Sequence, residues 1–344
     1  MTAPDWNDWP ELRRPGFDTS YNIMLFHLVP AIARAGIETG ILEALNLAPR
    51  TASELSSSLA LDSQAVEMFL SAAESIDLCR PTGDCWSLGS LGRLFSQDHP
   101  SESATALTAY AEPWHWANSQ LWQEAAQSMR TGQDAFRLIH GRGLFETLAA
   151  EPTLRRSFDA YTDNRTEHSL ADVVAGLDLK AGETLVDVGG GYSRLAAHAV
   201  EKYGVGAFVF DTPEVVREAV SRTGDKSQAQ FVGGDFFVDD LPAGDVYTLK
   251  EVVHNWNDEQ AVALLRNVGR AMPVGSRIAI VEQFRSAASG HRNALLSFGM
   301  FLAFGGRQRT SEQLDTLLAA AGFEPSRAVG IRHSTFDVLI ARKL

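Results

Sequence analysis

The sequence predicts an α/β protein: a helical winged-helix domain comes first, and a doubly wound, mostly parallel sheet follows. In the second half, amphipathic helices separate short runs of β-branched and aromatic residues, which is the pattern of βαβ units. The chain has 344 residues, about twice the usual size of a domain, so more than one domain is expected. The strand-like runs are residues 185–188, 207–210, 230–232, 246–249 and 278–281.

The N-terminal region begins with an apolar helix. Across residues 21–45 apolar side chains recur at helical spacing and cover a face wider than one neighbour needs. A capping box at residues 51–54 opens a short helix, and Asp62 caps the next one. Residues 76–79 and 85–88 flank a turn and predict a hairpin. Two helices followed by a hairpin make the order of a winged helix.

Charge argues against nucleic acid and anionic membranes as partners. The 43 acidic and 30 basic residues give a formal net charge of −13, which repels phosphate groups. A DNA-binding winged helix carries Lys or Arg on its second helix, whereas residues 62–76 carry only acidic charges. A structural or dimer-forming winged helix is therefore favoured over a transcriptional regulator.

Composition also points to a soluble cytoplasmic protein. Cys79 and Cys85 are too few for a disulfide framework and lack the His and Cys partners of a zinc site. The N-terminus is acidic where a secretion signal would be basic and then apolar, and no 18-residue apolar stretch occurs. We therefore expect no membrane anchor.

The middle and the end of the chain complete the predicted order of elements. Residues 101–176 show helical spacing again, and a domain boundary is expected near residues 175–182. Residues 311–321 predict a helix that Gly322 ends. Residues 327–333 and 336–342 predict a terminal strand pair.

A glycine-rich turn follows the first predicted strand of the sheet. Residues 186–194 read Val-Asp-Val-Gly-Gly-Gly-Tyr-Ser-Arg, so a ligand can approach the backbone closely at Gly189 and Gly191. The dinucleotide fingerprint would require a third glycine where Arg194 stands, which disfavours NAD.

Acidic residues end three successive predicted strands. Asp187 precedes the glycines, and Asp211 follows Gly191 by 20 residues, where a carboxylate can accept from both ribose hydroxyls. Asp235 can accept from an adenine amino group while Phe236 covers the ring. Each acid alone is more simply a solvated loop carboxylate or a helix cap. Together, without a phosphate cradle, they predict S-adenosylmethionine as the cofactor.

With these motifs the chain resembles the class I S-adenosylmethionine-dependent small-molecule O-methyltransferases that have an N-terminal dimerisation domain, such as the plant caffeate, hydroxyindole and bacterial natural-product enzymes. The resemblance extends to the Gly-Arg-Gln-Arg-Thr motif at residues 306–310. It implies a seven-stranded sheet with one antiparallel strand, S-adenosylhomocysteine as product and a homodimer formed through the N-terminal domain. The implied domains are a winged-helix dimerisation domain at 1–100, a helical connector and substrate-pocket lid at 101–178, and a cofactor-binding methyltransferase domain at 179–344.

His254 is the candidate catalytic base. It follows the fourth predicted strand, at the sheet edge where open α/β folds bind ligands, and imidazole has a suitable pKa for taking a hydroxyl proton. A hydrogen-bonded histidine at a helix start is the alternative interpretation. The resemblance favours the base, and it implies that Glu282 orients the imidazole and that Lys250 and Thr212 lie at the cofactor. Glu282 could instead be only a strand-end acid, and Lys250 only a surface charge.

Two residues depart from the family pattern around this base. Asn255 stands where the family's His-Asp-Trp motif has its aspartate. Gln308 stands where the family has a second glutamate that orients the histidine. An amide holds an imidazole N–H but adds no charge that stabilises imidazolium, so His254 is expected to be a weak base. Three explanations stay open: an acidic phenol as acceptor, C-methylation next to a carbonyl, or a relative that no longer transfers methyl. A metal held by His254 with His291 or His115 is the less favoured arrangement, so no metal site is predicted.

By family position, the acceptor pocket draws on side chains from the helical middle and from the region after the fifth strand. Aromatic residues at helical spacing are more often core than pocket, but together they imply a flat, mostly apolar small-molecule acceptor. Gly299 stands where relatives carry a bulky residue and so leaves extra room. The predicted pocket residues are Trp114, His115, Tyr161, Asn255, Leu295, Phe298 and Gly299.

Overall fold

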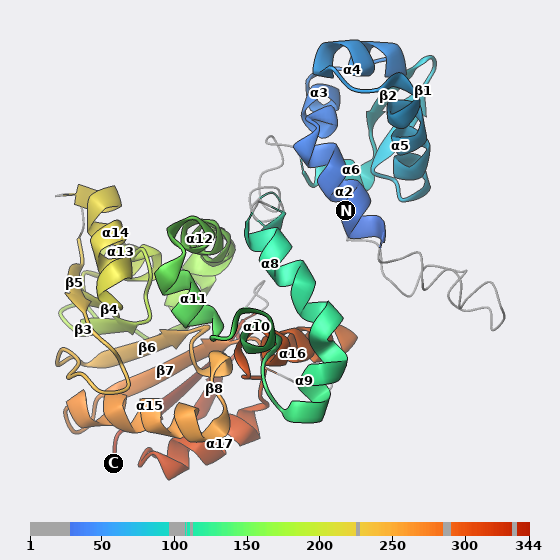
Figure 1. The fold of residues 1–344 in the computed structure, drawn as a ribbon. Coiled ribbons are helices and arrows are strands. Elements are labelled where there is room, and N and C mark those ends of the chain that lie inside the picture. Colours follow the sequence, from blue (N-terminus) through green and yellow to red (C-terminus); the bar gives the residue numbers. More distant parts are fainter. Residues whose placement is uncertain are drawn as a thin grey trace. The chain divides into compact units, whose positions relative to one another are not determined.

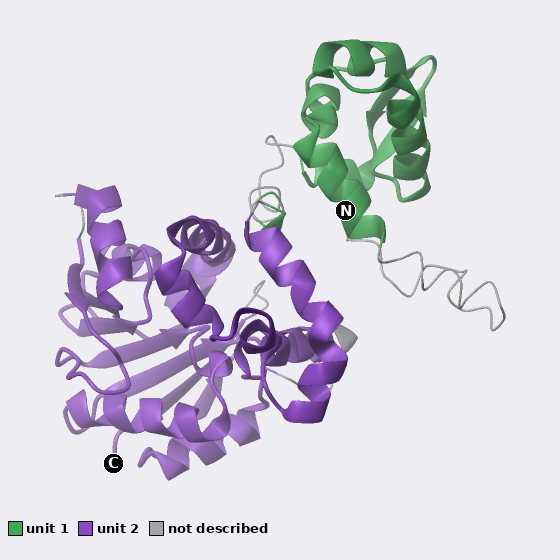
Figure 2. Ribbon diagram, viewed as in Figure 1, with its two compact units in different colours: residues 1–110 green, residues 111–344 purple. Residues whose placement is uncertain are grey.

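The structure is a computed structural model and describes residues 28–95, 107, 109–110, 113–224, 228–284, 290–331 and 336–344. The side chains of residues 168 and 290–292 are outside this description. The chain divides into two compact units, Met1–Tyr110 and Ala111–Leu344, shown in green and purple in Figure 2. The helices from Trp114 to Gly176 therefore belong to the same unit as the sheet.

The first unit has the predicted helix, turn, helix and hairpin order. Thr51 accepts from the backbone N–H of Glu54 in a complete capping box, and Asp62 caps the following helix. The hairpin strands pair antiparallel from Cys79 opposite Leu88 to Thr82 opposite Cys85. The elements are α2 (Leu28–Glu38), α3 (Ile41–Leu47), α4 (Ala52–Leu59), α5 (Ser63–Ser75), β1 (Cys79–Thr82), β2 (Cys85–Leu88) and α6 (Ser90–Arg93), drawn in blue to cyan in Figure 1.

The single helix predicted over residues 21–45 is wrong in its described part. The chain forms two helices there, because Gly40 takes the left-handed conformation with φ of 76° and ends the first of them. Residues 21–27 of that prediction lie outside the described part of the chain.

The second unit begins with a helical layer. Its elements are α8 (Trp114–Leu121), the 3-10 helix η3 (Trp122–Glu124), α9 (Ala125–Thr131), α10 (Ala135–His140), α11 (Leu144–Ala150) and α12 (Pro152–Gly176). Trp114, Leu121 and Phe136 pack in one apolar core with Leu302 of a later helix, α16 (Gly290–Phe304). The C-terminal end of α12 packs on the sheet through Val173. This layer therefore joins both α16 and the sheet.

The sheet has seven strands in the order β5-β4-β3-β6-β7-β9-β8. Five neighbouring strands run parallel, and β9 is antiparallel to both β7 and β8. The predicted mostly parallel sheet is confirmed. The strands are β3 (Thr184–Val188), β4 (Gly206–Asp211), β5 (Gln230–Gly233), β6 (Val246–Lys250), β7 (Arg277–Glu282), β8 (Arg327–Val329) and β9 (Asp337–Arg342). Residues 332–335, within the predicted terminal strand pair, lie outside the described residues.

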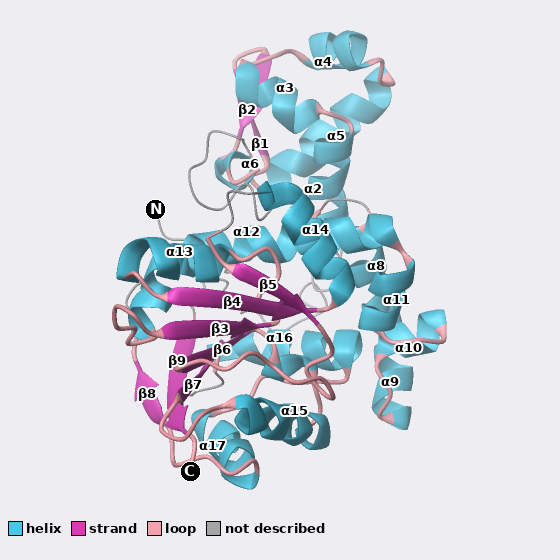
Figure 3. Ribbon diagram, turned by 90° about the vertical axis from the view of Figure 1, so that its left-hand side faces the viewer, coloured by secondary structure: helices cyan, strands magenta, loops and turns pink. Residues whose placement is uncertain are grey.

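Helices cover both faces of this sheet, as Figure 3 shows. One hydrophobic core joins Val186 and Ile278 to the helices on one face of the sheet. A second core joins Leu185 and Val209 to the helices on the other face. Alternate residues of a strand thus enter different cores, which explains why the strands read as continuous apolar runs. The remaining helices are α13 (Arg194–Tyr203), α14 (Pro213–Thr223), η5 (Val253–Asn255), α15 (Asp258–Ala271) and α17 (Ser311–Ala320).

The order of strands also locates the ligand crevice. The chain builds β3, β4 and β5 outwards in one direction and then returns to place β6 on the other side of β3. In open α/β sheets ligands bind at the carboxyl ends of the strands where the order reverses. In the described part of the chain, no helix is both long and apolar enough to span a bilayer.

Candidate active site

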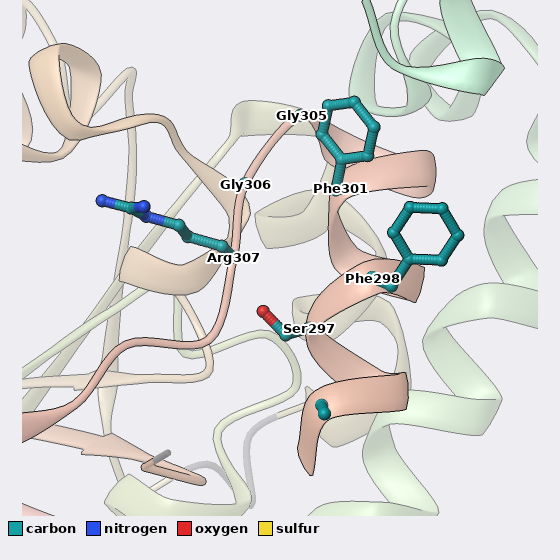
Figure 4. A pocket seen from close by; sticks show the side chains of 7 residues that line it. Ser297, Phe298, Phe301, Gly305, Gly306 and Arg307 are labelled. Carbon is teal, nitrogen blue, oxygen red and sulfur yellow. The ribbon is translucent and has the colours of Figure 1, made fainter. Parts of the chain in front are cut away.

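A cavity of about 730 Å³ opens at the carboxyl ends of β3, β4 and β6. The glycine turn after β3, the ends of the next two strands, the turn after β6 and one side of α12 line it. Strand-end acids and an imidazole thus share one space. A smaller pocket of about 400 Å³ lies beside α16 and includes Phe298 and Phe301. Figure 4 shows that Arg307 points away from α16, and this guanidinium pairs with Asp258 at 2.6 Å.

The glycine turn is shaped for close approach of a ligand. Gly189 and Gly191 have φ of 70° and 57°, and a Cβ on Gly191 would meet no atom within 4 Å. A Cβ on Gly190 would lie 2.6 Å from the carboxylate of Asp187, and one on Gly189 would lie 2.8 Å from Val252. Asp187 accepts from the Thr248 hydroxyl at 2.7 Å, and its burial raises its pKa to about 6.

The other two strand-end acids reach the same cavity. Asp211 accepts from the backbone N–H of Gly191 at 3.0 Å and from that of Thr212 at 2.7 Å, so the end of β4 is tied to the glycine turn. Asp235 accepts from the backbone N–H of Phe237 at 2.9 Å, and Phe236 packs edge-on against Trp256. All three acids, together with Thr212 and Phe236, line the cavity. Carboxylates in a cavity of this size, beside an open glycine turn, fit the adenosine of S-adenosylmethionine.

Arg194, which stands where a dinucleotide site would need glycine, connects this turn to α12. Its Nε lies 2.5 Å from Asp163 of α12. Tyr192 makes a second connection, because its hydroxyl donates to Asp159 at 2.8 Å. The glycine turn is therefore connected to α12 by two polar contacts that were not predicted from the sequence.

His254 lies in η5 with only 6% of its surface exposed, and it lines the cavity. Its Nδ1 is 3.1 Å from Nε2 of Gln308, so the predicted pairing of these two residues is present. The pKa of His254 is lowered to about 4, mainly by burial; the cations of Arg165 and Lys250 act in the same direction, and the carboxylate of Glu251 opposes them. The imidazole is therefore neutral near pH 7.

Glu282 contacts a different atom from the one expected. Its Oε1 accepts from the backbone N–H of His254 at 2.7 Å, which fixes the turn that bears His254 rather than the ring. Its Oε2 has no hydrogen-bond partner among the described residues. Burial raises the pKa of Glu282 to about 8, so the carboxyl is mostly protonated at pH 7. The expectation of an imidazole contact is corrected accordingly.

Arg309 also holds this turn and was missed from the sequence. Its side chain is buried, and it donates to the carbonyl oxygen of Val253 at 3.1 Å and to that of Trp256 at 2.7 Å. Asp258 pairs with the same guanidinium at 2.8 Å. The second arginine of the Gly-Arg-Gln-Arg-Thr motif was the available signal.

A cluster of charged side chains lies beside His254 in the same cavity. Arg165 and Lys250 form ion pairs with the carboxylate of Glu251 at 2.5 and 2.7 Å. The Arg165 guanidinium also donates to the hydroxyl of Tyr161 at 3.2 Å. Burial opposes ionisation of Glu251, but the two cations hold its pKa well below the ordinary range. Lys250, the residue expected near adenine, also donates to Thr166 at 3.2 Å. Its ammonium group is therefore bound to other side chains of the protein. Arg165 and Glu251 were not identified from the sequence.

Most of the predicted acceptor residues meet in the cavity. Trp114 stacks on Tyr161 with ring centroids 6.0 Å apart, and a Cβ on Gly299 would approach the Trp122 ring at 3.6 Å. The predicted residues that line the cavity are Trp114, Tyr161, Asn255, Leu295 and Gly299. The Asn255 amide donates to the carbonyl oxygen of Glu251 at 3.1 Å.

Two predicted acceptor residues do not line this cavity. Phe298 lines the smaller pocket instead and packs against Trp122, and His115 lines neither pocket. The side chain of His291 is outside the described residues. Within the described part, no three His, Cys, Asp or Glu side chains are grouped so as to hold a metal ion.

Comparison with known proteins shows the family. Residues 122–324, more than half of the chain, match the O-methyltransferase domain. The chain belongs to the O-methyltransferase family. O-demethylpuromycin-O-methyltransferase of Streptomyces alboniger is 31% identical over 290 residues, which cover 81% of this chain and 76% of that protein.

Solved structures of O-methyltransferases share the fold. A mitomycin 7-O-methyltransferase superposes with a TM-score of 0.85 at 23% identity, covering 95% of this chain and 97% of its own. An O-methyltransferase from neocarzinostatin biosynthesis, solved with S-adenosylmethionine and 2-hydroxy-5-methyl naphthoic acid, has a TM-score of 0.78 and 27% identity over 92% of this chain and 96% of its own. The predictions of the fold, the family and an S-adenosylmethionine-dependent methyltransferase are confirmed.

Proposed function

We propose that this O-methyltransferase moves the methyl group of S-adenosylmethionine to a hydroxyl of a small, flat aromatic natural-product intermediate, with His254 as general base. The observation that carries the proposal is the shared cavity. Three strand-end acids, a buried neutral imidazole and a set of aromatic walls all face it. Positioning of the two reactants and removal of one proton are the contributions the protein makes to such a transfer.

The cofactor half of the cavity holds the adenosine in this proposal. Asp211 accepts from the ribose hydroxyls, Asp235 accepts from the adenine amino group and Phe236 covers the ring. Asp187, Gly189 and Gly191 bring the backbone close to the amino acid end, with Thr212 and Lys250 beside the nucleoside. When bound, S-adenosylmethionine supplies a methyl carbon that its positively charged sulfur makes electrophilic.

The base requires one tautomer of His254. If the Gln308 amide donates to Nδ1, as the 3.1 Å contact with Nε2 implies, then the proton of the ring lies on its own Nε2 and that atom cannot act as a base. The Oε1 of Gln308 has no partner among the described residues, so turning the amide over gives this buried oxygen a donor in Nδ1–H. We assign the reverse orientation, in which Nδ1–H donates to Oε1 and the imidazole Nε2 is free to accept a proton.

The aromatic walls support a flat acceptor. Trp114 and Tyr161 stack on one side, and Phe145 stacks on Trp256 with centroids 5.4 Å apart. Such surfaces favour planar rings that pack face to face. The neocarzinostatin relative was solved with a substituted naphthoic acid, and the puromycin relative is named for O-methylation of a natural product. The acceptor class proposed for this chain follows from both observations.

A screen of acceptors tests the function. Purified protein is incubated with S-adenosylmethionine and panels of hydroxynaphthoic acids, other phenols, hydroxylated heteroaromatics and 2-oxo acids, and S-adenosylhomocysteine is measured with the product mass. Turnover that depends on a hydroxylated aromatic ring supports the proposal. Turnover with 2-oxo acids alone would contradict it in favour of C-methylation, and cofactor binding without turnover would indicate a relative that no longer transfers methyl.

The same proposal includes a homodimer formed through the N-terminal unit and a location in the cytoplasm, without nucleic acid as a partner. The dimer rests on the family resemblance, and the location rests on two cysteines that form no disulfide, Cys79 and Cys85. Light scattering should give about twice the chain mass of 37.5 kDa. A mass of one chain across the working concentration range would contradict the dimer.

A further inference from the structure

The charge cluster beside His254 is not neutral. Arg165 and Lys250 contribute two positive charges and Glu251 one negative charge, so 2 − 1 leaves a net charge of +1. The three side chains are only 23%, 8% and 18% exposed, so water screens them poorly. Each oxygen of Glu251 is used by one of the two cations. Both cations are therefore fixed in place.

Arg165 carries this charge to the acceptor side of the cavity. Its guanidinium donates both to Glu251 and to the hydroxyl of Tyr161, which stacks on Trp114. Glu251 has φ of 55°, a conformation that a residue other than glycine adopts only at a cost and that is concentrated at functional sites. The turn that leads to His254 thus contains a strained residue, Glu251, whose carboxylate holds Arg165 beside Tyr161.

The remaining charged groups that line the cavity are paired or belong to the cofactor half. Arg155 pairs with Asp159, Arg194 pairs with Asp163, and Glu214 pairs with Arg217. The three strand-end acids form the proposed nucleoside site. Among the described residues that line the cavity, the cation on the acceptor side is consequently Arg165, which contacts Tyr161.

The two products of proton transfer are affected differently. Burial disfavours the imidazolium of His254, whereas the guanidinium of Arg165 favours an oxyanion beside it. An ordinary phenol has a pKa of about 10, roughly 6 above the pKa of His254, so transfer of its proton to this imidazole is strongly unfavourable. The difference in pKa between the acceptor and His254 is smaller for a more acidic hydroxyl, so its proton is transferred more easily.

We propose that the acceptor is an acidic hydroxyl, carried by an aromatic ring with an electron-withdrawing group, and that Arg165 selects it by stabilising its oxyanion. This inference rests on the proposed function and decides among the explanations that the residues at positions 255 and 308 left open. The O–H bond breaks and its proton passes to His254. An oxygen lone pair then forms the bond to the methyl carbon while the electron pair of the sulfur–methyl bond stays on sulfur. Oxyanion and sulfonium thereby become a neutral ether and a neutral thioether.

A chromogenic probe measures the proposed stabilisation directly. The pKa of 4-nitro-1-naphthol, whose nitro group withdraws electrons and colours the anion, is measured by absorbance when bound to the wild-type complex with S-adenosylhomocysteine. We expect binding to lower this pKa by about 1 or more. Arg165→Gln should abolish most of the shift, and Arg165→Lys should keep most of it. Arg130→Gln, at an exposed position of α9, is the matched control and should change nothing.

Glu251→Gln gives a test of opposite sign. It leaves both cations uncompensated, so the bound probe should become still more acidic, whereas damage to the fold would shift both variants in the same direction. If loss of the buried partner prevents folding, the wild type decides by itself. Its kcat/KM at pH 7 should be at least about tenfold higher for 4-nitro-1-naphthol than for 1-naphthol, because the nitro compound is more fully ionised.

The failures of this inference and of the proposed function are distinguishable. Calorimetry with S-adenosylhomocysteine on the same samples and methylation of 1-naphthol report on the function alone. If the cofactor product binds and naphthols are methylated, but the bound nitronaphthol has its solution pKa or does not bind as an anion, then only the acidic acceptor is overturned. A shift that survives in Arg165→Gln would overturn the role of Arg165.

Discussion

The side-chain amide of Gln308 lies 3.1 Å from Nδ1 of His254, so an amide holds the imidazole where this family has a glutamate. An amide fixes the ring without adding a charge that stabilises its protonated form. Burial, with a smaller contribution from Arg165 and Lys250, lowers the pKa of His254 to about 4 despite the nearby carboxylate of Glu251. The ring is well oriented, yet it is a weak base.

Restoring the acid should strengthen the base. Gln308→Glu places a carboxylate at the imidazole, which should raise the pKa of His254 by about 1 to 3. Histidine-labelled protein titrated by NMR, with His254→Ala used to assign the signal, measures this change. Gln133→Glu, at an exposed loop position, should leave the signal unchanged. An unmoved His254 titration in Gln308→Glu would show that the two side chains are not electrostatically coupled.

Removing the base should cost turnover but not cofactor affinity. His254→Ala should lower kcat by about 10² to 10⁴, the usual contribution of a general base, while the Kd of S-adenosylhomocysteine stays within about twofold. The loss should be smaller with an acidic acceptor, because its proton leaves more easily. His140→Ala, exposed at the end of α10, serves as the control. Undiminished turnover would remove His254 from the role of base.

The ribose assignment predicts a binding defect at Asp211. Asp211→Ala removes a charged acceptor of hydrogen bonds, which typically costs about 1.5 to 3 kcal/mol, so calorimetry should show the Kd of S-adenosylhomocysteine rising by about tenfold or more. Asp240→Ala changes an exposed carboxylate that follows the next strand and should leave the Kd as it is. If both variants bind as tightly as the wild type, Asp211 does not hold the ribose.

Glu282 should make stability depend on pH. Its pKa is about 8 in the folded protein and near 4.5 when unfolded, so the folded state binds a proton more tightly. The stabilisation is complete below about pH 4.5 and is lost as the pH rises through 8. Measured by chemical unfolding, the free energy of unfolding of the wild type should decline between pH 5 and 9 by on the order of a few kcal/mol. Glu282→Gln should not show this decline. Equal pH profiles for the wild type and the variant would refute the raised pKa.

The predicted fold and the strand-end acids follow from local signals. The acids end strands, and parallel strands bring their carboxyl ends to one edge, so Asp187, Asp211 and Asp235 meet whatever the details of packing. Caps are also local, which is why the predicted capping box at Thr51 is present. Gly40 was harder, because apolar periodicity continues across it while one left-handed residue divides the helix.

The errors in the site arise where contact depends on three-dimensional direction. Glu282 ends its strand as expected, yet its carboxyl meets the backbone of His254 rather than the ring, a choice that sequence spacing does not encode. Arg165 and Glu251 are 86 residues apart and pair only because α12 crosses the end of β6. Phe298 and Gly299 are adjacent on α16 but turn toward different pockets, since neighbouring helix positions differ by about 100°.

The atom of the acceptor that receives the methyl group decides whether this protein is an O-methyltransferase with His254 as its base. Purified protein is incubated with S-adenosylmethionine labelled with carbon-13 at its methyl and with 1-naphthol, whose hydroxyl is protonated at pH 7 and needs a base, and the product is analysed by carbon-13 NMR. The account predicts a labelled methyl carbon bonded to oxygen, formed by the wild type and lost in His254→Ala. A labelled methyl on a ring carbon, or equal O-methylation by both proteins, would contradict it.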